Sequence, residues 1–85
     1  MGSIEYAKEL AAEKSLDFIE DGMVVGLGTG STAMRFIELL GERVQYGLKI
    51  RGIPTSRRSK ELAESLSIPI VDLHQCPEIN VAIDG

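Results

Sequence analysis

The chain has 85 residues, of which 44% are hydrophobic and 26% are charged, and its formal net charge at pH 7 is −4. A chain of this length forms at most one domain and buries only roughly 60–65% of the surface that it exposes when unfolded. The acidic balance argues against a nucleic-acid surface, because phosphate backbones require a basic patch. No apolar run reaches the roughly 18 residues of a membrane span, so no membrane segment is predicted.

The cellular setting and the redox chemistry follow from equally simple features. The first residues lack the basic and apolar regions of a secretory signal, which favours a cytoplasmic location. Cys76 is the single cysteine and His74 the single histidine. An internal disulfide is therefore excluded, a metal site is not expected, and Cys76 is interpreted as a structural thiol.

The first predicted element is an amphipathic helix over residues 4–19, in which apolar side chains recur between charged ones. Its apolar positions are Ile4, Ala7, Leu10, Ala11 and Phe18. Asp21 and Gly22 then predict a turn, because glycine tolerates a positive φ and aspartate bonds to nearby backbone groups.

Residues 23–27 predict a strand buried on both faces, because the segment is too short and too apolar for a surface helix. A second helix follows the next turn, and Ser31 or Thr32 is expected to cap it. The helix is predicted to pack one apolar stripe onto a sheet. This stripe consists of Ala33, Phe36, Ile37, Leu40 and Val44.

The remaining elements continue the alternation of strands and helices. Strands are predicted over residues 48–53, 68–73 and 79–83, and a short helix with Leu62, Ala63 and Leu66 as its apolar positions follows the first of them. Thr55 and Ser56 are expected to cap this helix. Such alternation through short connections favours an α/β, Rossmann-like fold with a mainly parallel sheet and flanking helices.

The most informative motif is the glycine-rich stretch Gly26-Leu27-Gly28-Thr29-Gly30, which Ser31 and Thr32 follow. Glycines let the backbone approach a ligand closely, and a helix N-terminus offers unpaired N–H groups and the positive end of its dipole. A purely structural turn is the alternative, but three glycines and two hydroxyls exceed what a turn needs. The stretch therefore predicts an anion-binding site.

Nucleotides are disfavoured as the ligand of this site. A dinucleotide fingerprint that starts at Gly26 needs a glycine where Ser31 stands, and no lysine follows the loop as a phosphate-binding P-loop requires. The sequence therefore predicts neither NAD nor ATP as a cofactor.

Other polar residues allow two interpretations each. Asp84 follows an apolar strand and faces the edge at which acid or base catalysis would occur, yet an Asp-Gly pair is also a common turn. The basic residues Arg57, Arg58 and Lys60 suit a solvated helix face, and the alternative is a weak electrostatic guide for an anionic substrate. His74 has no nucleophile motif beside it and is interpreted as a loop residue.

The order of these motifs resembles that of the ribose-5-phosphate isomerase family, type A. The resemblance rests on residues 24–33, on Ile53-Pro54-Thr55-Ser56 and on Val81-Ala82-Ile83-Asp84-Gly85, and it covers nearly all of the chain. It implies an aldose–ketose isomerase of the pentose phosphate pathway. Such an enzyme interconverts ribose 5-phosphate and ribulose 5-phosphate through an enediolate, without a metal or an organic cofactor.

The resemblance also implies roles for particular residues. Thr29, Gly30, Ser31 and Thr32 would line the substrate site, and Asp84 and Gly85 would begin the family's Asp-Gly-Ala-Asp-Glu motif. Asp84 would contact the sugar, assist ring opening and act as a catalytic residue.

The family's second aspartate, its lysine and its glutamate base would lie beyond Gly85. Residues 1–85 would then be the N-terminal part of a single, incomplete isomerase domain, inactive when isolated, from a family of homo-oligomers. The alternatives are a sugar-phosphate-sensing module of a regulator with the same fold, and a truncated chain without a function of its own.

Overall fold

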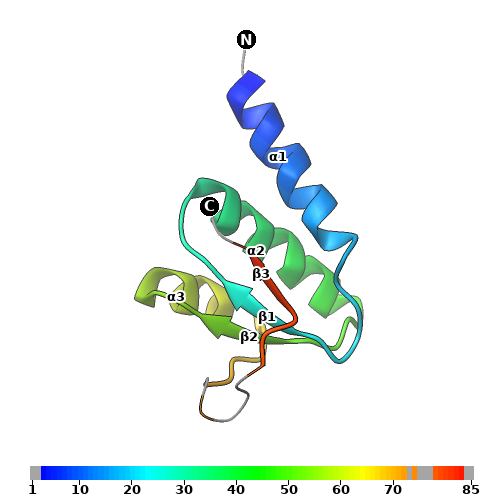
Figure 1. Cartoon of the computed structure of the whole chain (residues 1–85), viewed down its shortest axis with the longest axis vertical. Helices are drawn as coiled ribbons and strands as arrows, with labels where there is room; N and C mark the ends of the chain where they lie inside the picture. The colour runs from blue at the N-terminus through cyan, green and yellow to red at the C-terminus, as the bar shows by residue number, and fades with distance from the viewer. Residues whose placement is uncertain (1–2, 73, 75–77, 84–85) are drawn as a thin grey trace.

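The computed structural model describes residues 3–72, 74 and 78–83, and Cys76, Asp84 and Gly85 lie outside them. Helices and strands alternate along the described chain after the first helix (Figure 1). The elements are α1 (Ser3–Leu16), β1 (Val24–Leu27), α2 (Ser31–Gln45), β2 (Arg51–Pro54), α3 (Arg57–Ser65) and β3 (Val81–Ile83).

The strands form a parallel sheet in the order β2-β1-β3, so the α/β fold with a parallel sheet is confirmed. All four residues of β1 are buried, as expected for the central strand. Asn80 begins the pairing of β3, because its side-chain Oδ1 accepts a hydrogen bond from the Val24 N–H at 2.7 Å and its own N–H donates to the Val24 carbonyl at 2.8 Å.

The predicted strand over residues 68–73 is wrong in extent. The described part of this segment makes a single bridge, in which Ile70 pairs with Gly52. The Gly52 N–H donates to the Pro69 carbonyl at 2.7 Å, and the Val71 N–H donates to the Gly52 carbonyl at 2.9 Å. Pro69 has no N–H to extend this ladder, and Leu73 lies outside the described residues.

The core lies between the sheet and the helices α2 and α3. The predicted apolar stripe of α2 is confirmed, since Ala33, Phe36, Ile37 and Leu40 are buried and Val44 is half-buried. These side chains join β1 and α3 in one cluster. Its fully buried members outside α1 and α2 are Val25, Leu27 and Ala63.

The predicted apolar face of α1 is wrong. Ala7, Leu10 and Ala11 are exposed, and Phe18 lies beyond the end of the helix at Leu16 with 70% of its surface exposed. Among the α1 side chains that the structure describes, the buried ones are Ala12 and Leu16, one helical turn apart. Figure 1 shows the reason, because α1 packs against α2 while its N-terminal part extends away from the rest of the fold. The side chain of Ile4 is not among those described.

The predicted turn at Asp21 and Gly22 is confirmed, and Gly22 has a φ of +89°. This turn is tied to the segment before β2. The Gly22 N–H donates to the Lys49 carbonyl at 2.6 Å, and the Asp21 carboxylate accepts from the Lys49 N–H at 2.9 Å.

The predicted cap of α3 by Ser56 is confirmed. Its hydroxyl oxygen accepts from the Ser59 N–H at 3.1 Å, and the Ser56 N–H donates to the Ser59 hydroxyl at 3.2 Å. This reciprocal arrangement is a capping box, and it satisfies amide groups that the first helical turn leaves unpaired. Ser59 is fully buried, so its hydroxyl depends on these bonds.

Ser56→Ala is expected to lower the free energy of unfolding by about 1 kcal/mol, because the first turn of α3 loses its side-chain acceptor. Ser65→Ala is the matched control, since the exposed Ser65 hydroxyl only donates to the Leu62 carbonyl within the same helix. Urea unfolding of both variants measures the difference. Equal unfolding midpoints would contradict a stabilising role for the cap.

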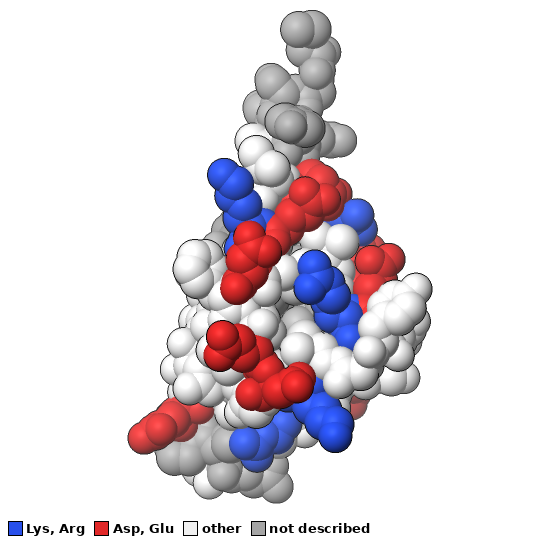
Figure 2. Space-filling model, turned by 90° about the vertical axis from the view of Figure 1, so that its right-hand side faces the viewer, with Lys and Arg blue, Asp and Glu red and all other residues white. Residues whose placement is uncertain are grey.

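The surface carries both signs of charge. On the face shown in Figure 2, acidic and basic side chains are interspersed over the described residues. No helix in the described part of the chain has the length and apolar character needed to cross a membrane.

Candidate functional site

The three strands end side by side at the carboxyl edge of the sheet. Leu27, the last residue of β1, is in register with Pro54 of β2 and with Ile83 of β3. The turn that begins at Gly28 therefore starts beside Thr55, which follows β2. Ligands of parallel α/β sheets bind at this edge. Asp84 and Gly85, which were also predicted here, lie outside the described residues.

Helix α2 begins at this edge without a side-chain cap. Gly30 holds the cap position with a φ of +106° and a ψ of 163°, and its carbonyl accepts from the Met34 N–H at 2.9 Å. The prediction that Ser31 or Thr32 caps the helix is wrong. Both residues already belong to the first turn, whereas a capping side chain must come from the residue before it.

The missing cap leaves the first amide groups of α2 without a side-chain acceptor. Gly28 is buried beneath the turn, Thr29 and Ser31 are exposed, and Gly30 and Thr32 are half-buried. The predicted site residues from Thr29 to Thr32 are thus together and accessible at a helix N-terminus. This arrangement suits an anion, because unpaired N–H groups and the positive end of the dipole coincide.

Thr55 links the end of β2 to the end of β1 at the carboxyl edge of the sheet. Its N–H and its hydroxyl both donate to the Leu27 carbonyl, at 3.0 Å and 2.9 Å. The prediction that Thr55 caps α3 is therefore wrong, because its side chain bonds to β1 while Ser56 supplies the cap.

A hollow of about 310 Å³ opens beside the start of α2. Its lining residues are Gly30, Ser31, Met34, Arg35, Glu38 and Arg58. The Arg35 guanidinium is held by two carboxylates, since its Nε donates to Glu9 at 2.6 Å and its Nη1 donates to Glu38 at 3.4 Å. The hydrogen bond to Glu9, with a smaller contribution from Glu38, raises the pKa of Arg35 above its usual value.

Sequence reasoning missed Arg35 and its partners. The pair of Arg35 and Glu38 has the i, i+3 spacing of helical neighbours, which is a usable signal. The pair of Arg35 and Glu9 joins α2 to α1 across a long stretch of sequence and leaves no local pattern.

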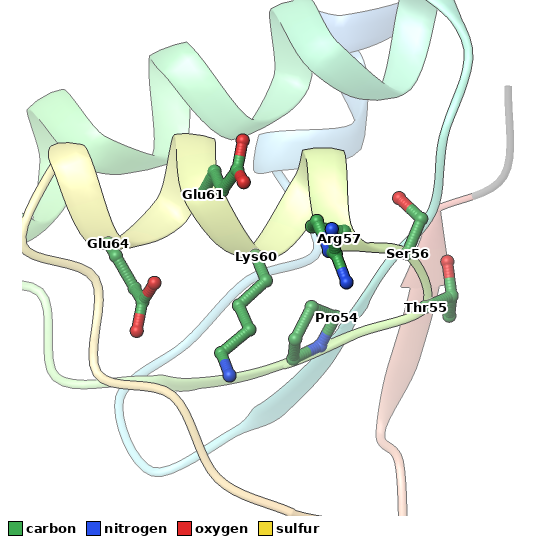
Figure 3. Close-up of a pocket in the computed structure, with 7 residues that line it drawn as sticks. All are labelled: Pro54, Thr55, Ser56, Arg57, Lys60, Glu61 and Glu64. Carbon is green, nitrogen blue, oxygen red and sulfur yellow. The ribbon is translucent and has the colours of Figure 1, made fainter.

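A larger hollow of about 610 Å³ lies between α3 and the end of β2 (Figure 3). Its lining residues are Pro54, Thr55, Ser56, Arg57, Lys60, Glu61 and Glu64. In Figure 3, Lys60 and Glu64 point from α3 toward β2. This hollow mixes two carboxylates with two cations, and the first turn of α3 beside it is already capped by Ser56. The smaller hollow is therefore the better anion site.

The described residues hold no cluster of three or more His, Cys, Asp and Glu side chains that could bind a metal ion. His74 is exposed and its N–H donates to the Asp72 carboxylate at 3.4 Å. This hydrogen bond is local, because the two residues are two positions apart in the sequence.

Comparison with known proteins identifies relatives over almost the whole chain. Residues 51–85 match the family model of ribose 5-phosphate isomerase A, also called phosphoriboisomerase A. The chain is 52% identical over 84 residues to ribose-5-phosphate isomerase A of Natronomonas pharaonis, and 46% identical over 83 residues to that of Bartonella quintana. These alignments cover 99% and 98% of the chain but only 37% and 36% of the relatives.

Solved structures give the same result. A D-ribose-5-phosphate isomerase in complex with phospho-erythronic acid superposes with a TM-score of 0.90 at 52% identity, over 95% of this chain and 36% of that one. Ribose 5-phosphate isomerase A of Methanocaldococcus jannaschii superposes with a TM-score of 0.91 at 44% identity, over 98% of this chain and 37% of that one.

The chain thus spans about a third of the length of these relatives. Over that stretch it shares both their sequence and their fold, which confirms the resemblance carried by the glycine-rich turn and the strand ends. The chain is thus similar in sequence and in fold to the ribose-5-phosphate isomerase A family.

Proposed function

We propose that this chain supplies one side of the active site of an isomerase that interconverts ribose 5-phosphate and ribulose 5-phosphate through an enediolate. The observation that carries the proposal is the uncapped start of α2 at Gly30, set at the carboxyl edge of the sheet. The similarity to the ribose-5-phosphate isomerase A family supports it, as does a solved relative in complex with phospho-erythronic acid. The isomerase names of the relatives favour an enzyme over a sugar-sensing module.

The chain's own residues would hold the substrate. The amide groups and hydroxyls from Thr29 to Thr32 would donate hydrogen bonds to anionic or hydroxylated substrate groups. Asp84 would contact the sugar and assist ring opening, with Gly85 beside it. Residues 1–85 would form part of a single isomerase domain, in a homo-oligomer located in the cytoplasm, with neither a membrane nor a nucleic acid as partner.

The chemical step itself requires a general base. Isomerisation moves a proton between C1 and C2, and the loss of such a base costs on the order of 10²–10⁴ in rate. None of the 85 residues is assigned this role in our proposal. The reaction as proposed uses no metal and no organic cofactor, because proton transfer needs only acid and base groups.

The activity of a full-length protein that contains this sequence tests the proposal. We expect it to convert ribose 5-phosphate to ribulose 5-phosphate, and we expect Asp84→Asn to lower kcat because the carboxylate that assists ring opening is lost. Coupled spectrophotometric assays of both proteins measure the effect. The purified 85-residue chain is the control and should not isomerise the sugar.

Two results would contradict parts of this proposal. An unchanged kcat in the Asp84→Asn protein would remove Asp84 from the catalytic residues. Isomerisation by the purified 85-residue chain would show that the base lies within it.

A further inference from the structure

The first turn of α3 carries charges that its own helix disfavours. The helix begins with Arg57 and Arg58, and neither α3 nor α2 has an acidic residue in its first turn. Cations at a helix N-terminus are repelled by the positive end of the dipole. Sequences break such local rules mainly at functional sites, so the two arginines require a separate explanation.

Arg58 lines the same hollow as the uncapped start of α2. Gly30 and Ser31 form one wall of this 310 Å³ space, and Arg58 reaches it from the neighbouring helix. The volume lies in the range of about 300–1,000 Å³ that is typical of small-molecule sites. Arg57 lines the larger hollow on the other side of α3 instead (Figure 3).

Two arginines line the hollow, and Arg58 is the one whose charge is available to a ligand. Arg35 also lines the hollow, but its guanidinium is paired with Glu9 and Glu38. Glu38 is the acidic side chain of the lining, and it is engaged by Arg35. No ion pair within the described part of the chain involves Arg58, which is exposed.

We propose that Arg58 is a substrate-binding residue that grips the phosphate group held by the first turn of α2. This inference rests on the proposed function, since it assigns the phosphorylated end of the sugar to this hollow. A guanidinium binds phosphate through two parallel N–H···O hydrogen bonds, which adds orientation to charge. The bound anion would also neutralise the repulsion between Arg58 and the dipole of its own helix.

The test is a titration of the 85-residue chain with inorganic phosphate and with ribose 5-phosphate. The amide resonances of Gly30, Ser31 and Thr32 report on binding. Arg58→Ala is expected to weaken the affinity for both ligands about tenfold, because a charge-assisted hydrogen bond is lost. Arg58→Lys should recover part of the affinity, since lysine restores the charge but not the two parallel hydrogen bonds of a guanidinium.

Arg57→Ala is the matched control. It removes the same charge from the same helical turn but faces the other hollow, so it should change the affinity less than about twofold. Thermal unfolding without ligand checks the fold of each variant. Both alanine variants should unfold at the same temperature as the unmodified chain or higher, because each removes a cation from a helix N-terminus.

The outcomes separate this inference from the proposed function. Unchanged affinity in Arg58→Ala, with the Gly30–Thr32 amides still shifting, would overturn the role of Arg58 and leave the anion site intact. Equal losses in Arg57→Ala and Arg58→Ala would also overturn it, because general attraction by positive charge would then explain binding. If phosphate shifts none of these amides in the unmodified chain, the anion site fails and the role of Arg58 fails with it.

Discussion

Phe36→Ala is expected to lower the free energy of unfolding by about 3–5 kcal/mol, which is the usual cost of deleting a buried aromatic ring. Phe36 is fully buried in the middle of α2 and belongs to the core cluster with Val25 and Leu27 of β1. A small domain has only roughly 5–15 kcal/mol of stability to lose. The variant should therefore be largely unfolded at modest urea concentrations, as circular dichroism would show.

Phe18→Ala is the control, because Phe18 is the other phenylalanine of the chain and 70% of its surface is exposed. Its free energy of unfolding should change by less than about 0.5 kcal/mol. If both variants lose the same stability, the placement of Phe36 at the centre of the core is wrong.

Gly30→Ala is expected to destabilise the chain by about 1–3 kcal/mol and to weaken phosphate binding by about tenfold or more. The backbone of Gly30, at φ +106° and ψ 163°, lies in a region that only glycine occupies readily. A side chain there would force the turn to rearrange and redirect the amides at the start of α2. Urea unfolding and a phosphate titration measure the two effects.

Gly47→Ala separates strain from binding. Gly47 has nearly the same φ, +107°, but follows the opposite end of α2, and a Cβ added there meets no atom within 4 Å. It should lose stability comparably and keep its affinity for phosphate. Loss of affinity in both variants would mean that general destabilisation, rather than the geometry at Gly30, governs binding.

The parts of the fold that the sequence predicts well are those in which pattern and burial coincide. Residues 24–27 and the stripe from Ala33 to Leu40 face the same core. Their apolar spacing follows from this packing, so the spacing alone is enough to predict it. The stripe of α1 is different. Ala12 and Leu16 are buried because α1 meets α2 over only part of its length, and no local spacing contains that information.

The candidate site also combines features that the sequence predicts with features that it does not. The glycine-rich turn before α2 is predicted from the order of residues, because glycines and hydroxyls that follow an apolar run indicate a strand that ends in a turn. Identifying Gly30 as the cap requires the first residue of the helix to be known without error. Sequence patterns do not define helix boundaries that finely. The approach of Arg58 to Ser31 depends on how two helices lie beside each other, so only the structure could reveal it.

The double hydrogen bond from Thr55 to the Leu27 carbonyl ties the ends of β1 and β2 together. Both lone pairs of that oxygen are occupied, so the seam between β1 and β2 is closed at its end. These bonds fix the edge of the sheet below the first turn of α2 before any ligand binds, and a site that is already ordered loses less entropy on binding.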